Sequence, residues 1–208
     1  MFTIKHASVV FADIAGSSAI MQRDEIEGLA SLEKFRRTIT ANVCDFNGQL
    51  LHIWGDGCLA TFNSANDAIQ FAINVQNQFM QPPCSIDVRM GINCGEVHMT
   101  DNNAYGHAVN QASYLESISK PGAVLITDCV RKELSNKNQK LLISMGNLRT
   151  KVDEHFKIFA VNSHGLVVPG RKDFKYLACA KNDKSTSFRE GIKSFIKLFE
   201  PIIKNGVL

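Results

Sequence analysis

Two aspartates lie beside glycines in segments that are far apart in the sequence. Asp13 is closely followed by Gly16, and Asp56 lies between Gly55 and Gly57. Mg²⁺ prefers a few carboxylates plus substrate phosphates, and two such ions roughly 3.5–4 Å apart can activate a hydroxyl and steady a leaving phosphate. The small neighbours would let triphosphate oxygens approach the backbone. A simpler interpretation stays open, in which Asp56 is only a turn residue and Asp13 only a helix cap.

The pattern of the first 95 residues predicts elements that would bring these aspartates together. Strand-like segments and helical spacings of apolar residues follow one another in the order β-α-β-β-α-β. This is the ferredoxin-like plan, so we predict an α+β fold. The first crossover makes the first two strands parallel, and the end of the first then lies at the same sheet edge as the turn after the second. The expected strands are residues 7–13, 49–54, 58–62 and 85–93, and the expected helices are residues 32–43, ended by Asn47-Gly48, and 64–79.

Further elements are expected beyond this core. Ser187 and Glu190 form a capping box before an apolar stripe, which predicts an amphipathic helix near the C-terminus. We therefore predict a domain over residues 1–162 and an extension over residues 163–208 that holds nine basic and four acidic side chains. The additional expected elements are sheet residues 97–99, a helix over 108–118, a strand over 122–127, a helix from 129 to 134 and a strand over 156–161.

The composition excludes several classes of protein. With 45% hydrophobic and 21% charged residues, the 208-residue chain is typical of a globular protein. It contains no apolar run of the roughly 18–20 residues that a membrane span needs and no signal peptide, so we expect a cytoplasmic protein. The net charge of +3 is mild, and no nucleic-acid partner is expected. No Cys-x-x-Cys pair occurs, so free thiols are predicted and a structural zinc site is not; the six cysteines are residues 44, 58, 84, 94, 129 and 179.

Five segments, in order and with family-like spacing, resemble the catalytic domain of class III nucleotidyl cyclases. The resemblance covers roughly residues 6–161. It implies an enzyme that converts a nucleoside triphosphate to a 3′,5′-cyclic monophosphate and pyrophosphate. The matching segments are residues 9–18, which hold the first signature, residues 48–62, which hold the hairpin, and residues 88–97, 105–116 and 121–127.

The resemblance also implies roles for particular residues. Two Mg²⁺ or Mn²⁺ ions would lie on Asp13 and Asp56, with the carbonyl of Ile14 helping. Asn110 matches the amide that holds the ribose in the transition state. Family sites form between subunits, so a head-to-tail homodimer with composite active sites is implied. The residues implied to bind substrate are Phe11, Ile14, Gly16, Ser17, His52, Trp54 and Asn103.

Several positions depart from the family pattern. The transition-state arginine is replaced by Tyr114, whose hydroxyl cannot replace a guanidinium fork. Arg149 and Lys151 are candidate replacements, because they lie where the family carries a phosphate-binding lysine; a solvated turn is the alternative for both. The positions that read the purine hold His52 and Asn103, which match neither the adenylate nor the guanylate cyclase pair.

Three functions remain open at this point. The pattern is most similar to the compact uridylate and cytidylate cyclases of bacterial Pycsar antiphage systems, which implies a pyrimidine substrate, with UTP favoured over CTP, and a separate effector that receives the cyclic nucleotide. The first alternative is an adenylate or guanylate cyclase with an atypical base pocket. The second is a non-catalytic homologue that binds nucleotide or a partner. A diguanylate cyclase would need a different hairpin from residues 55–59.

Overall fold

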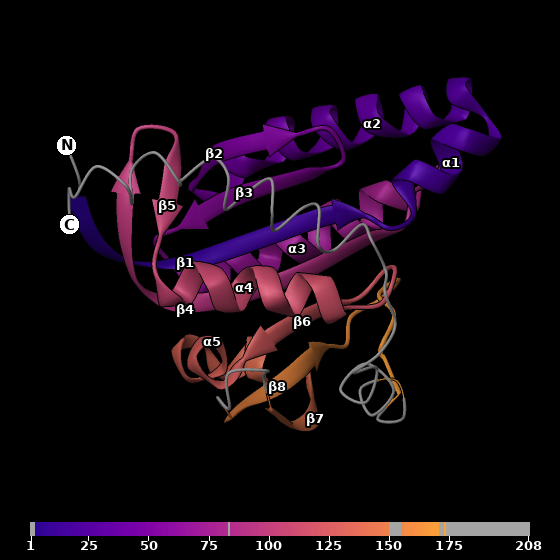
Figure 1. Cartoon of the computed structure of the whole chain (residues 1–208). Helices are drawn as coiled ribbons and strands as arrows, with labels where there is room; N and C mark the ends of the chain where they lie inside the picture. The colour runs from indigo at the N-terminus through magenta and orange to yellow at the C-terminus, as the bar shows by residue number, and fades with distance from the viewer. Residues whose placement is uncertain (1–2, 83, 150–154, 171–172, 174–208) are drawn as a thin grey trace.

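The computed structural model describes residues 3–82, 84–149, 155–170 and 173. In this part of the chain, eight strands form one mixed sheet in the order β2-β3-β1-β4-β6-β8-β7, with β5 paired to β4 (Figure 1). The strands are β1 (Thr3–Ile14), β2 (Gly48–Trp54), β3 (Gly57–Phe62), β4 (Val88–Thr100), β5 (Asn103–Tyr105), β6 (Val124–Thr127), β7 (Leu142–Arg149) and β8 (His155–Val161). The helices are α1 (Ser17–Arg23), α2 (Glu25–Val43), the 3-10 turn η1 (Cys44–Phe46), α3 (Ala65–Phe79), α4 (His107–Ile118), α5 (Asp128–Glu133) and α6 (Asn136–Gln139).

The first four strands have the ferredoxin-like arrangement that the sequence predicts. β1 is antiparallel to both β3 and β4, and β2 is antiparallel to β3. β1 and β2 therefore run in the same direction with β3 between them. The α+β fold class is confirmed, and the end of β1 lies beside the β2–β3 turn.

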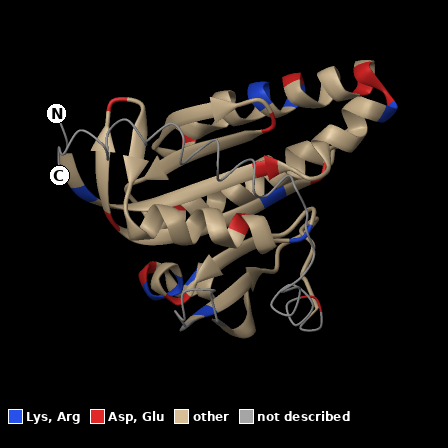
Figure 2. Cartoon of the chain, viewed as in Figure 1, with Lys and Arg blue, Asp and Glu red and all other residues tan. Residues whose placement is uncertain are grey.

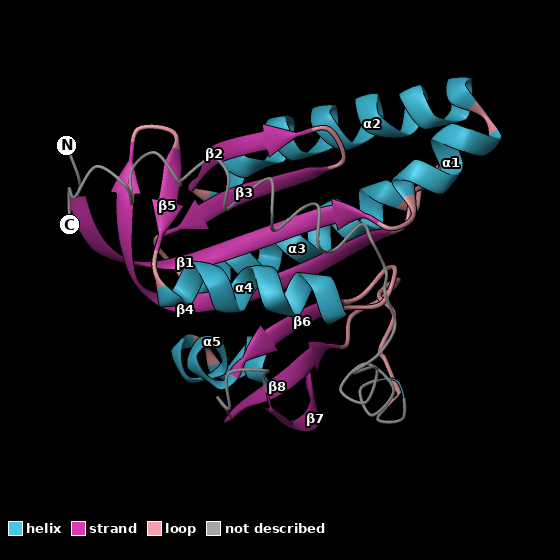
Figure 3. Cartoon of the chain, in the orientation of Figure 1, coloured by secondary structure: helices cyan, strands magenta, loops and turns pink. Residues whose placement is uncertain are grey.

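Helices cover the two faces of the sheet (Figure 3). On one face, Val10 and Ala12 of β1 join a buried cluster with residues of α2 and α3. On the other face, Val9 and Phe11 pack with residues of α4. Because side chains alternate along a strand, Asp13 belongs to the α4 face. Its position on that face decides which side chains can reach it.

A side-chain cap marks the start of α2, and a 3-10 turn followed by a left-handed residue marks its end. The Asp24 side chain accepts hydrogen bonds from the backbone N–H groups of Ile26 and Glu27, at 2.9 and 3.0 Å, so the helix begins with its first donors satisfied. The helix ends at Val43 and continues as the η1 turn. The left-handed residue after it is Asn47, with φ of 55°, and not the glycine that follows, because an asparagine also tolerates this conformation.

Some features of the structure differ from the pattern-based expectations. β1, β4 and α2 are longer than expected, and α1, β5, β7 and α6 were not predicted. Arg149 ends β7 opposite His155, so the backbone there is a strand and not a turn. The predicted C-terminal amphipathic helix lies outside the described residues. Among the described helices, none combines the length and the apolarity needed to cross a bilayer.

Candidate active site

The two aspartates predicted to converge lie together at the end of β1. Asp13 is opposite Gly57 in the β1–β3 register. The backbone N–H of Ile14 donates a hydrogen bond to the backbone carbonyl of Asp56 at 2.8 Å, which fastens the β2–β3 turn to β1. Strand pairing thus brings together two aspartates that are 43 positions apart in the sequence. The role of the pair as metal ligands stays a prediction.

A left-handed turn places Ser17 against this pair. Gly16 has φ of 72° and ψ of 22°, and a Cβ built there meets nothing within 4 Å. Glycine is therefore favoured by the backbone angle and not by crowding. The turn starts α1 directly after β1, and the Ser17 hydroxyl donates a hydrogen bond to the Asp56 carboxylate. This bond orients the carboxylate of Asp56.

Two further charged residues, which the sequence reasoning missed, surround Asp13. Arg89 lies opposite Asp13 in the β1–β4 register, and its guanidinium pairs with the Asp13 carboxylate. The same guanidinium nitrogen lies 3.2 Å from Oε1 of Glu116 on α4, without hydrogen-bond geometry. In the ribbon of Figure 2, acidic positions on β1 and α4 and a basic position on β4 are coloured where these elements approach one another. Arg89 therefore holds Asp13 in place and leaves Glu116 as a second, weaker partner.

Burial and crowding of negative charge raise the pKa of both carboxyl groups. Burial raises the pKa of Asp13 to about 6; the charge of Asp56 adds to the rise, and Arg89 opposes it. Burial raises the pKa of Glu116 to about 8, with Asp13 and Asp56 adding to the rise and Arg89 again opposing it. At neutral pH, Glu116 is therefore mostly protonated, and Arg89 forms its ion pair with Asp13.

The donor set at this edge fits a hard divalent cation. Three carboxyl groups, those of Asp13, Asp56 and Glu116, lie around the single guanidinium of Arg89; burial is the main cause of the raised pKa of Asp13, and repulsion by the charge of Asp56 adds to it. A divalent cation would relieve that repulsion, and carboxylate oxygens are the ligands that Mg²⁺ and Mn²⁺ prefer. Asp13 and Asp56 are the residues that could hold such a cation, which stays a prediction.

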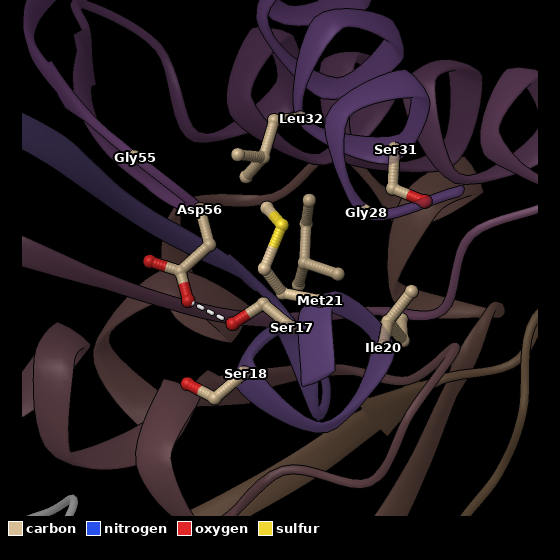
Figure 4. A pocket seen from close by; sticks show the side chains of 10 residues that line it. Ser17, Ser18, Ile20, Met21, Gly28, Ser31, Leu32, Gly55 and Asp56 are labelled. Atoms are coloured by element: carbon tan, nitrogen blue, oxygen red, sulfur yellow. Dashed lines mark hydrogen bonds between the residues drawn. The ribbon is translucent and has the colours of Figure 1, made fainter. Parts of the chain in front are cut away.

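A pocket of about 200 Å³ opens beside Asp56 (Figure 4). Ser17 and Asp56 face each other at its rim, and the side chains of Ile20, Met21 and Leu32 form much of its wall. These walls are apolar, so the pocket alone lacks the cations that a triphosphate needs. The other lining residues are Ile14, Ser18, Gly28, Ser31 and Gly55.

Three aromatic side chains predicted to bind substrate form one group on the α4 face. The rings of His52 and Trp54 on β2 are stacked, with centroids 5.5 Å apart and planes inclined by 26°. The ring of Phe11 lies 6.0 Å from that of Trp54. A Cβ on Gly57 would come within 2.5 Å of the indole nitrogen of Trp54, so the glycine lets the indole lie across the hairpin. His52 is exposed and forms the outer surface of the group.

The two predicted asparagines lie on different elements. Asn103 lies on β5, which contacts β2, and its side-chain oxygen accepts a hydrogen bond from the backbone N–H of Ala104 at 2.9 Å. Asn110 is exposed on α4. It lies about 9 Å along the helix from Glu116, the residue of α4 whose carboxyl group lies beside Arg89. The structure therefore does not bring Asn110 to the carboxylates of its own chain.

The position of the missing arginine is filled by a packed ring. Tyr114 is half-buried, its ring makes an edge contact with Phe156 at 6.3 Å between centroids, and burial raises the pKa of its hydroxyl. Tyr114 therefore packs inside its own chain and supplies no positive charge. The Arg149 side chain and all of Lys151 lie outside the described residues, so their predicted role as replacements stays a prediction.

The titration of Glu116 has a consequence for stability. The folded chain holds a proton on Glu116 up to about pH 8, whereas the unfolded chain loses it near the ordinary 4.5. Since the folded state binds more protons across that window, stability falls as pH rises through it. We expect Glu116→Gln to remove this decline in the free energy of unfolding, which is on the order of a few kcal/mol. The measurement is urea unfolding in the presence of EDTA at pH 5, 6.5 and 8. The exposed Glu96→Gln is the control, and parallel profiles for Glu116→Gln and wild type would contradict the assignment.

Fold and site together define an α+β domain with an acidic pair at the end of its first strand. The chain belongs to the adenylate and guanylate cyclase catalytic domain family, whose model matches residues 2–163. This is the class to which the sequence motifs pointed.

Individual relatives and solved structures agree with this family. An adenylate cyclase from Streptomyces griseus is 32% identical over 127 residues, and one from Streptomyces coelicolor is 30% identical over 131 residues. The matches cover 61% and 62% of this chain, but the chain spans only 32% and 34% of these relatives' lengths.

The adenylate/guanylate cyclase/hydrolase structure from Silicibacter pomeroyi has a TM-score of 0.70 at 28% identity, covering 78% of this chain and 99% of that one. The catalytic core of a rhodopsin-guanylyl cyclase with converted specificity, in complex with ATPαS, shares the fold with a TM-score of 0.72 at 22% identity; the match covers 78% of this chain and 99% of that one.

Proposed function

We propose that this protein is a metal-dependent nucleotidyl cyclase that converts a pyrimidine nucleoside triphosphate, UTP before CTP, to its 3′,5′-cyclic monophosphate and pyrophosphate. The observation that supports the chemistry is the pair of carboxylates of Asp13 and Asp56, fastened together at the end of β1 and crowded with negative charge. Such a pair has an electrostatic reason to hold divalent cations that also bind phosphates.

The chain's own residues position the reactants. Asp13 and Asp56 would hold two Mg²⁺ or Mn²⁺ ions, which supply charge neutralisation on the phosphates and a more acidic ribose 3′-hydroxyl. Arg89 fixes the carboxylate of Asp13, and Ser17 fixes that of Asp56. The 3′-hydroxyl would lose its proton to solvent, its oxygen would attack the α-phosphorus in line, and the bond from that phosphorus to the pyrophosphate oxygen would break. Positioning and charge stabilisation account for most of the acceleration in such transfers.

The second half of the site is proposed to come from another copy of the chain. Asn110 is exposed on α4 and lies away from the aspartates of its own chain. In a head-to-tail homodimer, the Asn110 of one protomer would hold the ribose at the aspartates of its partner. Arg149 and Lys151 would contribute the positive charge that Tyr114 cannot.

The geometry around His52 supports a pyrimidine. The stacked rings of His52 and Trp54 occupy part of the space beside β2 in which a base would lie. They also offer an aromatic face on which that base could stack. The oxygen of Asn103 already accepts from Ala104, which fixes the amide orientation and leaves its NH₂ group as the donor. At the 4-position of the ring, a donor complements the carbonyl oxygen of uracil, whereas cytosine carries an amine there that is itself a donor.

The biological role follows from the same resemblance. The proposed product is a second messenger in bacterial antiphage defence, as in the Pycsar systems, and a separate effector would receive it. The competing proposal is an adenylate cyclase with an atypical pocket, because the two Streptomyces relatives carry that name.

A four-way incubation tests the substrate. Purified protein with Mn²⁺ receives ATP, GTP, CTP or UTP separately, and mass spectrometry detects the cyclic monophosphates. We expect cyclic UMP as the main product. Cyclic AMP or GMP alone would refute the pyrimidine assignment, and no product from any of the four in the presence of bound nucleotide would favour a binding module.

The role of His52 gives a second test. We expect His52→Ala to raise the KM for the preferred triphosphate roughly 5- to 100-fold, the range of one lost base–aromatic stack, with a smaller change in kcat. His164→Ala, an exposed histidine on a distant loop, is the control. Equal KM values for wild type and His52→Ala would show that the base does not rest on this ring.

A further inference from the structure

Four side chains with metal-binding atoms meet on the face of the sheet opposite Asp13. His6 Nε2 lies 2.7 Å from Oε1 of Glu133, Cys94 Sγ lies 3.2 Å from the same oxygen, and Cys129 Sγ lies 2.7 Å from Cys94 Sγ. The ligand atoms of His6, Cys94 and Glu133 all lie within 4.8 Å of one another. Within the described residues, these three form the one such group of His, Cys, Asp and Glu side chains.

The cluster is built on elements that hold three of its members firmly. Cys129 and Glu133 are four residues apart on α5, so they share one face of the helix. The Thr127 hydroxyl accepts a hydrogen bond from the backbone N–H of Val130, which caps this helix. The same hydroxyl donates to Asn93, next to Cys94, at 2.7 Å. α5 is thus tied to β4, and the exposed His6 of β1 can adjust to the other three.

We propose that His6, Cys94, Cys129 and Glu133 form a binding site for a thiophilic divalent cation, with zinc as the metal. Two sulfurs, one imidazole nitrogen and one carboxylate oxygen complete the four-coordinate set that zinc takes in proteins. Mg²⁺ and Ca²⁺ prefer oxygen ligands throughout, so the two sulfurs select against the metals proposed for the catalytic aspartates.

To bind the ion, three close contacts must open slightly and the Cys129 side chain must move inward. Zinc–ligand bonds of about 2.0–2.3 Å place neighbouring ligand atoms roughly 3.3–3.8 Å apart in a tetrahedron. The contacts of His6 and Cys94 with Glu133 measure 2.7 and 3.2 Å and the two sulfurs lie 2.7 Å apart, so each of these pairs must open by about 1 Å or less. Cys129 Sγ lies outside the group whose ligand atoms are all within 4.8 Å of one another, so the Cys129 side chain must also turn toward the other ligands. On binding, both thiols release a proton to solvent, and His6 keeps its proton on Nδ1 while Nε2 binds the metal.

The surroundings of the four ligands give a metal ion access to the site and suggest a structural role for it. A hollow of about 510 Å³ lined by Cys94 and Cys129 opens beside the sulfurs, which gives the ion a path to the buried Cys94. The bound metal would join the start of β1 to β4 and α5. The sequence analysis predicted no zinc site because the ligands come from three distant segments without a paired-cysteine motif, and the sheet brings those segments together.

Cobalt and zinc titrations of the full-length, reduced protein test this site. We expect one zinc per chain by elemental analysis, and with Co²⁺ alone the sulfur-to-cobalt charge-transfer absorption and visible bands of tetrahedral cobalt. Oxygen ligands at the catalytic aspartates cannot give the sulfur band. His6→Gln and Cys129→Ser, both at exposed positions, should each weaken zinc binding roughly tenfold or more. Cys44→Ser and His164→Gln are controls that should bind as wild type does.

Three results would overturn the proposal. The first is no sulfur-to-cobalt absorption in the reduced protein. The second is an absorption that His6→Gln and Cys129→Ser leave unchanged. The third is a Cys94–Cys129 disulfide, seen as a loss of two hydrogens in the intact mass, in a chain that still binds no zinc after reduction. Because Cys94 is buried and its replacement could unfold the chain, the test rests on the two exposed positions.

Discussion

Replacing Asp56 with asparagine is expected to lower kcat/KM by roughly 1,000-fold or more while leaving the fold intact. The side chain keeps its shape, and Ser17 can still donate to the remaining oxygen. What is lost is one negative charge at the end of β1. Without it, the acidic pair cannot neutralise a bound divalent cation, and the phosphates lose the ion that positions them.

Asp56 gives a cleaner variant than Asp13. In Asp13→Asn, Arg89 loses its main partner and Glu116 becomes the carboxylate that pairs with it, so a change in the ion pair accompanies the loss of activity. The measurement is turnover with Mn²⁺ together with Mn²⁺ binding followed by EPR. Asp45→Asn, an exposed aspartate on η1, is the matched control. Wild-type product formation by Asp56→Asn would refute the assignment of the pair as metal ligands.

The elements with strong periodicity could be predicted from the sequence. α3 carries a capping serine at Ser64 and apolar residues on one face, and the structure places the helix where that pattern indicates. β7 could not be predicted in the same way. It pairs only with β8, its register shifts between Ser144 and Gly146, and its side chains mix exposed and buried positions. Its existence depends on a partner strand, which local pattern does not reveal.

In the candidate site, too, some residues could be predicted from the sequence and others could not. Asp13 and Asp56 could be brought together by topology alone, because strand direction fixes which ends of strands meet. Arg89 and Glu116 could not be assigned in this way, since their proximity depends on the register of β1 against β4 and on how α4 lies on the sheet. That approach is close: a Cβ on Gly91 would lie 2.3 Å from the carbonyl oxygen of Ala112. Such packing distances are properties of the folded chain and not of spacing along it.

The proposal of a composite active site rests on where α4 points its side chains. Glu116 faces the aspartates through Arg89. Asn110 is six positions earlier, about 9 Å along the helix and rotated by roughly 120° to a different face. No rotamer of an asparagine spans that distance. If Asn110 acts on substrate, it therefore acts at the aspartates of a second chain, and each homodimer contains two sites with residues from both protomers.

Mixing two inactive variants should restore activity if this is correct. Asp13→Ala removes the metal half of a site and Asn110→Ala removes the ribose half, so a heterodimer of the two contains one intact site and one doubly defective site. With random assortment of equal amounts, about a quarter of wild-type sites are recovered. The control is a mixture of Asp13→Ala with Asp56→Ala: both defects lie in the same half of the site, so no heterodimer contains an intact one. Activity that stays at the level of the separate variants in the first mixture, with heterodimers demonstrated by native mass spectrometry, would show that Asn110 does not complete the partner's site.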